Sequence, residues 1–149
     1  MTKHILSIVI CCLVHICFSQ KITRAETKKM LFRTNRVIYA SYEALKETKN
    51  FRGNLSNAYA HQKLAVTYFR KGLFNKSIFH SLHARKQAEK TISYNRRVNP
   101  DESVLDAKEN AFFMGSPEEK ILAKELKDSG IVLQEETELI KLSPRINIE

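Results

Sequence analysis

The spacing of apolar residues predicts one long amphipathic helix near the beginning of the chain. Between Ile22 and Asn50 no proline or glycine interrupts the sequence, and apolar or small residues recur at helical spacing. The members of this stripe are Met30, Leu31, Val37, Ile38, Ser41, Tyr42, Ala44 and Leu45. Gly53 is expected to end the helix, because glycine readily adopts the left-handed conformation that closes helices.

Two further helices are predicted to form a hairpin. The first begins at a capping residue, Asn54 or Ser56, and ends near Gly72. The second follows a tight turn and continues to about Asn95. It carries small residues at positions i, i+4, i+7 and i+11, where a neighbouring helix can approach closely. These small residues are Ser77, Ser81, Ala84 and Ala88.

The second half of the chain is predicted to contain shorter helices. Pro100 disfavours helix at the residue before it, and a short helix is expected over residues 101–113. The stretch "SPEEKILAKELKDSG" predicts a helix from Pro117 to Ser129, in which Ser116 is the N-cap and Glu119 completes a capping box. We expect this acidic helix to pack on or near the basic first half.

Together these elements predict an all-α fold, a small antiparallel helical bundle. The helical domain is expected to span residues 20–130, and residues 131–149 to form a C-terminal tail with some helix around 135–142. Ile131, Val132 and Leu133 are the residues by which this tail would dock.

Residues 1–19 have the pattern of a secretory signal peptide. Lys3 precedes a mostly apolar segment from Ile5 to Phe18, and cleavage is expected near Ser19. As a membrane anchor the segment is short, since it would reach roughly 21 Å across a hydrocarbon core of roughly 30 Å. A retained signal anchor and a lipoprotein stay open as alternatives. The expected location is therefore secreted or periplasmic.

The cysteines narrow the chemistry. All three, Cys11, Cys12 and Cys17, lie in the predicted signal peptide, so the mature chain would have none. A secreted protein without disulfides is held together by packing. Thiol enzymes and cysteine-ligated zinc proteins are excluded on the same ground.

The charge is divided unevenly along the chain. Residues 20–100 carry 18 Lys and Arg against four Glu, whereas residues 101–149 carry six Lys and Arg against 12 acidic residues. This division predicts either a basic face for an anionic partner or an acidic half that folds back on the basic half.

The predicted hairpin resembles a tetratricopeptide repeat. The residues in the order and spacing of that repeat are Leu64, Ala65, Tyr68, Gly72, Phe74, Ser77, Ile78 and Ala84. Residues 58–91 therefore resemble one degenerate unit, and a shift of about 34 residues in either direction finds no second one. The resemblance implies a close-packed hairpin and, as the commonest role of that family, protein binding. The chain as a whole also resembles small secreted helical proteins of bacteria, which implies no activity.

Three histidines of the predicted mature chain could gather on the hairpin. His80 and His83 are three residues apart on one helical face, and His61 lies on the preceding helix. Their sequence neighbours are cationic, which argues against a metal ion, and we predict none. Together with Tyr68 they are the predicted protein-binding residues; contacts that respond to pH are a further alternative.

A basic surface for polyanions is the second predicted site. Its candidate residues are Lys28, Lys29, Arg33, Arg36, Arg85, Lys86, Lys90, Arg96 and Arg97. Interleaved tyrosines could add stacking. In an extracytoplasmic compartment the fitting partners are anionic glycans or lipid surfaces, without specific binding of nucleic acid.

No catalytic constellation stands out in the sequence. It contains no Gly-x-Ser-x-Gly elbow, no His-Glu-x-x-His and no phosphate-binding glycine loop. Glu109 with Glu118 or Glu119 could pair as in a glycosidase, but nothing favours a particular pair. The sequence therefore predicts a protein that is not an enzyme and takes no cofactor, and that binds another extracytoplasmic protein. Electrostatic binding of anionic envelope polymers is the alternative.

Overall fold

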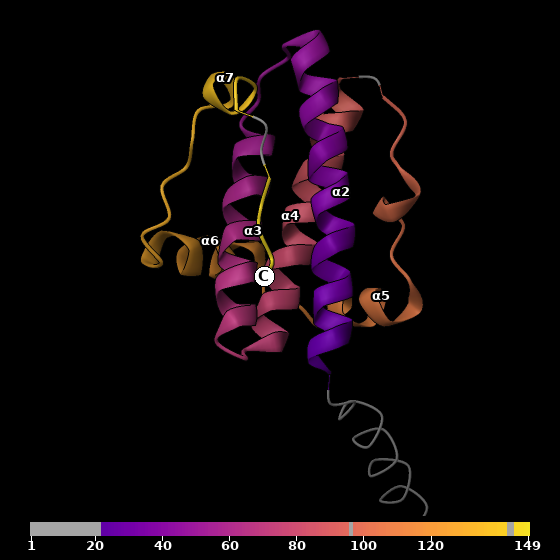
Figure 1. Ribbon diagram of the computed structural model, residues 1–149, viewed down its shortest axis with the longest axis vertical. Helices are drawn as coiled ribbons and strands as arrows, with labels where there is room; N and C mark the ends of the chain where they lie inside the picture. Colours follow the sequence, from indigo (N-terminus) through magenta and orange to yellow (C-terminus); the bar gives the residue numbers. More distant parts are fainter. Residues whose placement is uncertain (1–21, 96, 143–144) are drawn as a thin grey trace, which may run out of the picture.

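A computed structural model describes residues 22–95, 97–142 and 145–149, and in these residues the protein is an all-α helical bundle without strands (Figure 1). The predicted fold class is thus confirmed. The predicted signal peptide lies outside the described residues. No helix within the described part is both long and apolar enough to span a membrane.

Three long helices form the bundle. They are α2 (Arg24–Thr48), α3 (Asn54–Arg70) and α4 (Phe74–Tyr94), and they run up, down and up beside one another (Figure 1). All three agree in extent with the helices predicted from the apolar spacing. The predicted stop at Gly53 is wrong, because Lys49 already adopts the left-handed conformation that closes α2, with φ of 55°. The start of α2 is fixed by a reciprocal capping box between Thr23 and Glu26.

The small residues of α4 bring the three helices close together, as predicted. Ser77, Ser81, Ala84 and Ala88 are all fully buried. The Ser81 hydroxyl lies 2.9 Å from the Thr34 hydroxyl of α2, and the Ser77 hydroxyl donates to the main-chain oxygen of Ala65 in α3 at 2.8 Å. The stripe therefore contacts both neighbouring helices.

A tight turn at Gly72 joins α3 to α4. Its φ of 74° is in the left-handed region, which favours glycine. The amide of Leu73 donates to the main-chain oxygen of Tyr68 at 2.9 Å and closes the end of α3. The hairpin is thus present, while the resemblance to a tetratricopeptide repeat stays a prediction.

The chain that follows α4 passes around the outside of the bundle (Figure 1). We call the described residues from 97 onward the belt. Its elements are η1 (Asp101–Ser103), α5 (Ala107–Met114), α6 (Glu119–Asp128) and α7 (Glu136–Leu139). In Figure 1, α5 lies beside the lower part of α2, whereas α6 lies crosswise to α3 on the opposite side.

The single helix predicted over residues 101–113 is wrong. The chain forms one 3-10 turn, extends through Val104, and begins α5 only after Asp106, which caps that helix together with Glu109. The extended residues allow Arg33 of α2 to bond the main-chain oxygen of Val104.

Helix α6 agrees with its prediction in extent but not in its cap. Glu118 is the N-cap and its side chain makes no capping bond. The Ser116 hydroxyl instead donates to the main-chain oxygen of Phe113 at 2.8 Å. The predicted cap is wrong because this hydroxyl bonds a carbonyl at the end of α5.

The predicted caps of α3 are replaced by an acid from the belt. Gly53 is the N-cap of α3, and glycine has no side chain with which to cap the helix. The buried carboxylate of Glu136 accepts from the amides of Arg52 and Leu55, at 2.8 Å each. The end of the chain thereby closes the beginning of α3.

The predicted tail is docked by one of the expected residues and by others. Ile131 is partly buried against Ala60, Leu64 and Leu126, as expected, whereas Val132 and Leu133 are exposed. Leu139 and Ile148 are buried instead. Residues 145–149 are extended, and Ile148 packs against Leu31 of α2 and Phe69 of α3.

Candidate functional site

The three histidines predicted to bind a partner come together between α3 and α4. The Nδ1 atoms of His61 and His80 lie 2.9 Å apart, and the rings of His61 and His83 meet edge to face with centroids 4.5 Å apart. The ring of Tyr68 lies beside His80, at 5.4 Å between centroids. The structure thus brings these four residues together, and their role in binding stays a prediction.

These histidines are buried and do not line an open surface. His61 is 2% exposed, His80 is not exposed, and His83 is 9% exposed. Burial disfavours the charged imidazole and lowers all three pKa values, that of His61 to about 3. The cluster is therefore neutral at neutral pH.

Helix α6 covers part of this cluster and supplies its acid. Glu125 lies 2.9 Å from Nε2 of His80 and 2.7 Å from Nζ of Lys76. A neutral His80 that donates to Glu125 leaves Nδ1 as an acceptor for the N–H of His61. Burial alone would raise the pKa of Glu125, but the hydrogen bonds from Lys76 and His80 outweigh burial and lower that pKa.

Two leucines one helical turn apart attach α6 to the hairpin. Leu126 packs in a cluster with Ala60 and Leu64 of α3, and Tyr68 packs against the same cluster. Leu122 is also buried and lines a small hollow of about 80 Å³ together with His83. We call the surface under α6, formed by Ala60, His61, Leu64, Tyr68, Lys76 and His80, the α3–α4 face.

The sequence did not indicate that α6 meets the histidines. It showed no acid near them along the chain, because Glu125 comes from a helix that follows about 45 residues later. The one available signal was the spacing of Leu122 and Leu126, which marks an apolar stripe on an otherwise charged helix.

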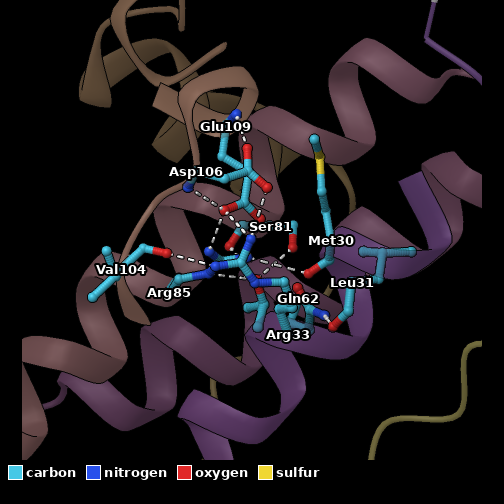
Figure 2. Close-up of polar contacts among 10 residues, drawn as sticks. Met30, Leu31, Arg33, Gln62, Ser81, Arg85, Val104, Asp106 and Glu109 are labelled. Atoms are coloured by element: carbon cyan, nitrogen blue, oxygen red, sulfur yellow. Dashed lines mark hydrogen bonds and ion pairs between the residues drawn. The ribbon is translucent and has the colours of Figure 1, made fainter. Parts of the chain in front are cut away.

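Arg85 makes a second, wholly buried polar network. Its guanidinium bonds both carboxylate oxygens of Glu109 at 2.8 and 3.0 Å, the hydroxyl of Thr34 at 3.2 Å and the main-chain oxygen of Met30 at 3.3 Å. Figure 2 shows Arg33 reaching the same carboxylate from the other side. Each nitrogen of the Arg85 guanidinium bonds an oxygen of the protein and the side chain is fully buried, so Arg85 is not part of a surface. Its assignment to a polyanion surface is wrong.

The other predicted polyanion residues fall into two groups. Arg33, Arg36 and Arg97 form ion pairs with Glu109 and Asp106, with Glu102, and with Glu47, respectively. Arg96 lies outside the described residues. No acid of the described residues forms an ion pair with Lys28, Lys29, Lys86 or Lys90.

The acidic half of the chain therefore lies on the basic half. Besides the pairs of Arg33, Arg36 and Arg85, Lys76 of α4 bonds Glu125 of α6 at 2.7 Å. Of the two interpretations of the charge division, the structure has the one in which the acidic part folds back.

The polar clusters of the described residues do not form a metal site. No group of three or more histidine, cysteine or acidic side chains in the described ranges is arranged to hold a metal ion. Both polar clusters consist of side chains that satisfy one another, and α6 lies over the histidines. The arrangement holds a helix of the same chain, α6, against the histidines.

Comparisons with known proteins do not add a family. No protein-family model, no curated protein and no solved structure matches the chain. The fold and the site thus define a class only, an all-α bundle in which a hairpin holds an acidic helix.

Proposed function

We propose that the protein is a non-catalytic interaction module whose α3–α4 face binds an acidic amphipathic helix of a partner protein. The observation that carries this proposal is the seating of α6 on that face through Leu122, Leu126 and Glu125. A helix with apolar residues at i and i+4 that lies on an apolar surface is a recurring mode of protein recognition. The partner would share the compartment predicted by the signal peptide, outside the cytoplasm.

The attachment of α6 is weak enough for exchange. Burial of one leucine contributes about 1.5–3 kcal/mol, so two contribute about 3–6 kcal/mol. Most other side chains of α6 are exposed, so a helix that buries more apolar surface on this face can displace it.

The chemistry of the face favours an acidic partner. Lys76 and His80 converge on one carboxylate of α6, and Lys76 also lies over the ring of Tyr68. The resemblance of the hairpin to a protein-binding repeat supports the same function.

The proposal can be tested with a helix added in trans. In the double variant Leu122→Ala and Leu126→Ala the internal helix loses its two anchors, so a labelled peptide with the sequence of residues 116–131 should bind more than tenfold tighter than to the wild type. Fluorescence anisotropy measures the affinity. The matched control is Ile121→Ala with Lys124→Ala, two exposed positions of α6, which should leave binding as in the wild type.

The proposal fails if the folded double variant, with helicity unchanged by circular dichroism, does not bind the peptide. The same variant identifies natural partners when used as bait beside the wild type. A partner of the proposed kind is enriched by the double variant and stays bound at high salt, because apolar contacts respond little to salt.

Electrostatic binding of anionic polymers or lipid surfaces is a second candidate function. The outward side of α2 favours it, because exposed Phe32 and Tyr39 alternate there with Lys29 and Arg36. Binding of this kind should weaken steeply between about 50 and 200 mM salt and should depend on Lys28 and Lys29. Retention on a heparin column, with Lys28→Ser and Lys29→Ser as the comparison, measures it.

A further inference from the structure

A second segment of the chain, residues 145–149, lies on the bundle without forming a helix or a strand. It follows the line where α2 and α3 pack together (Figure 1). We call this line the α2–α3 seam; its members that contact the segment are Leu31, Asn35, Ala65, Val66, Phe69 and Arg70.

Alternate side chains of the segment enter the seam. Ile148 is 2% exposed and packs with Leu31, Ala65, Val66 and Phe69, and Ile146 is partly buried against the same cluster. The residues between and beside them, Arg145, Asn147 and Glu149, are exposed. In an extended chain, residues two apart point to the same side, so the seam contacts the side chain of every second residue.

Side chains of the seam recognise the main chain of the segment. Asn35 donates to the main-chain oxygen of Ile146 at 2.9 Å, and Arg70 donates to those of Asn147 and Glu149 at 3.1 and 2.7 Å. Contacts to main-chain oxygens do not depend on the residue type of the segment. The seam therefore has the two components of peptide recognition, main-chain bonds for affinity and apolar positions for selectivity.

Gln62 supports the seam through Asn35 but has one polar atom without a hydrogen-bond partner among the described residues. Gln62 donates to the main-chain oxygen of Leu31 at 2.9 Å and to the side-chain oxygen of Asn35 at 2.8 Å, and so fixes the Asn35 amide. Its own Oε1 is buried and has no hydrogen-bond partner among the described residues. A buried acceptor without a donor is unfavourable.

We propose that the α2–α3 seam is a binding site for an extended segment of a partner protein, with branched aliphatic residues two positions apart followed by an acidic residue. Residues 145–149 occupy this site in the free protein. The preference for an acid follows from charge, because the exposed Arg24 lies over the ring of Phe69 at 4.5 Å and Arg70 lies at the same end of the seam.

Displacement is feasible because residues 145–149 make few contacts. One side chain is fully buried and three of the five residues are exposed. Because residues 145–149 are tethered, their effective concentration at the seam is on the order of millimolar. A partner with a longer matching segment can bind tightly enough to compete with them. The internal segment would then reduce the apparent affinity of the partner by the fraction of seam that it leaves free.

The test uses the full chain with its own segment disabled. In the variant Ile146→Asp with Ile148→Asp the seam is vacated, and the peptide RINIE should bind it saturably in an NMR titration, with shifts confined to α2 and α3. The peptide RIINE has the same composition but adjacent isoleucines, and should bind at least tenfold more weakly. Arg70→Met, added to the vacated chain, should weaken RINIE several-fold, because it removes two main-chain contacts.

Two matched comparisons separate this site from the others. The variant Leu142→Asp changes an exposed apolar residue of the same region and should leave the seam occupied, with binding of RINIE at least tenfold weaker than in the vacated chain. The double variant Leu122→Ala and Leu126→Ala, which frees the α3–α4 face, should also leave RINIE binding as in the wild type. Failure of the proposed function and failure of the seam are thereby distinguishable.

The proposal is overturned if the vacated chain, folded by its NMR spectrum, gives no saturable shifts or binds RINIE and RIINE equally. It is also overturned as a site for a foreign partner if the wild type forms a concentration-dependent dimer that Ile148→Asp abolishes, because the occupant would then be a second copy. Selection of random peptides on the vacated chain should enrich Ile or Val at two alternate positions before Asp or Glu.

Discussion

Arg85 is the residue at which the two halves of the chain meet. It belongs to α4, is fully buried, and bonds both oxygens of Glu109 from α5. A buried charge is tolerated only where partners compensate for the water it has lost. The pair therefore fixes α5 to the bundle at one position.

Removal of one partner should destabilise the protein strongly. In Glu109→Gln the guanidinium of Arg85 remains buried without its counter-charge, and we expect a loss of about 3–5 kcal/mol in the free energy of unfolding. Urea denaturation measures the loss. The double variant Arg85→Met with Glu109→Leu should recover most of it, because neither charge remains buried.

An exposed ion pair provides the control for this prediction. Arg36→Met removes the partner of Glu102 on the outer side of α2 and should change the free energy by less than about 1 kcal/mol. If Glu109→Gln has an equally small effect, then the network of Figure 2 does not hold α5 in place.

His61 should make the stability depend on pH in the mildly acidic range. Its pKa is lowered by burial from 6.5 to about 3. Between these two pH values the unfolded chain binds a proton at His61 that the folded protein does not bind. Stability is then complete above pH 6.5 and falls as the pH decreases toward 3. At pH 5 the expected loss from this residue is about 2 kcal/mol.

The comparison of wild type with His61→Gln isolates this effect. Denaturation at pH 7 and at pH 5 should show a smaller difference for His61→Gln by about the same 2 kcal/mol, since all other titrating groups are common to both proteins. Equal pH dependence in the two proteins would mean that His61 is hydrated or charged in the folded state.

At the scale of the element, α3 depends on an acid from a distant part of the chain. The carboxylate of Glu136 bonds the amides of Arg52 and Leu55, where free amides and the helix dipole favour a negative charge. Glu136→Ala should reduce the free energy of unfolding by about 1–2 kcal/mol. Thermal denaturation by circular dichroism measures this change.

Glu138→Ala is the control for the cap. Glu138 belongs to the same short helix, but its carboxylate is exposed and pairs with Lys141 on the surface. Its replacement should have an effect below about 0.5 kcal/mol. Equal effects of the two replacements would show that α7, and not its carboxylate, stabilises α3.

The long helices could be predicted from the sequence because they need only their own pattern. The apolar stripe of α2 and the glycine after α3 are local signals, and their positions agree with the structure. The cap at Ser116 failed because a hydroxyl can bond any nearby carbonyl, and here it bonds Phe113. The cap of α3 could not be predicted at all, since its carboxylate comes from residue 136.

The candidate site was predictable to the same limited degree. Helical spacing is sufficient to bring His61, His80 and His83 together on a hairpin. Their burial depends on where α6 lies, which follows from tertiary packing of Leu122 and Leu126. Arg85 was misassigned for the same reason, because nothing in its neighbourhood along the chain announces Glu109.

At the scale of the whole molecule, a bundle of three helices carries a belt that is attached at separate positions. The hairpin of α3 and α4 contains most of the fully buried side chains, among them Leu55, Phe69, Ile78 and Ile92. The belt has two buried acids that bond the bundle, Glu109 and Glu136, and small apolar contacts of α6 and of residues 145–149. Such a structure should open in steps.

Hydrogen exchange should therefore show an order of protection that follows the attachments. Amides of α3 and α4 should exchange slowest, those of α5 next because Glu109 is buried, and those of α6 faster still because two leucines hold that helix. Mass spectrometry of exchanged peptides measures each element separately. In Leu122→Ala with Leu126→Ala, exchange in α6 should accelerate while α4 stays unchanged. If α6 in the wild type is as protected as α4, the belt opens only when the bundle unfolds, and a partner helix could not replace α6 on the folded protein.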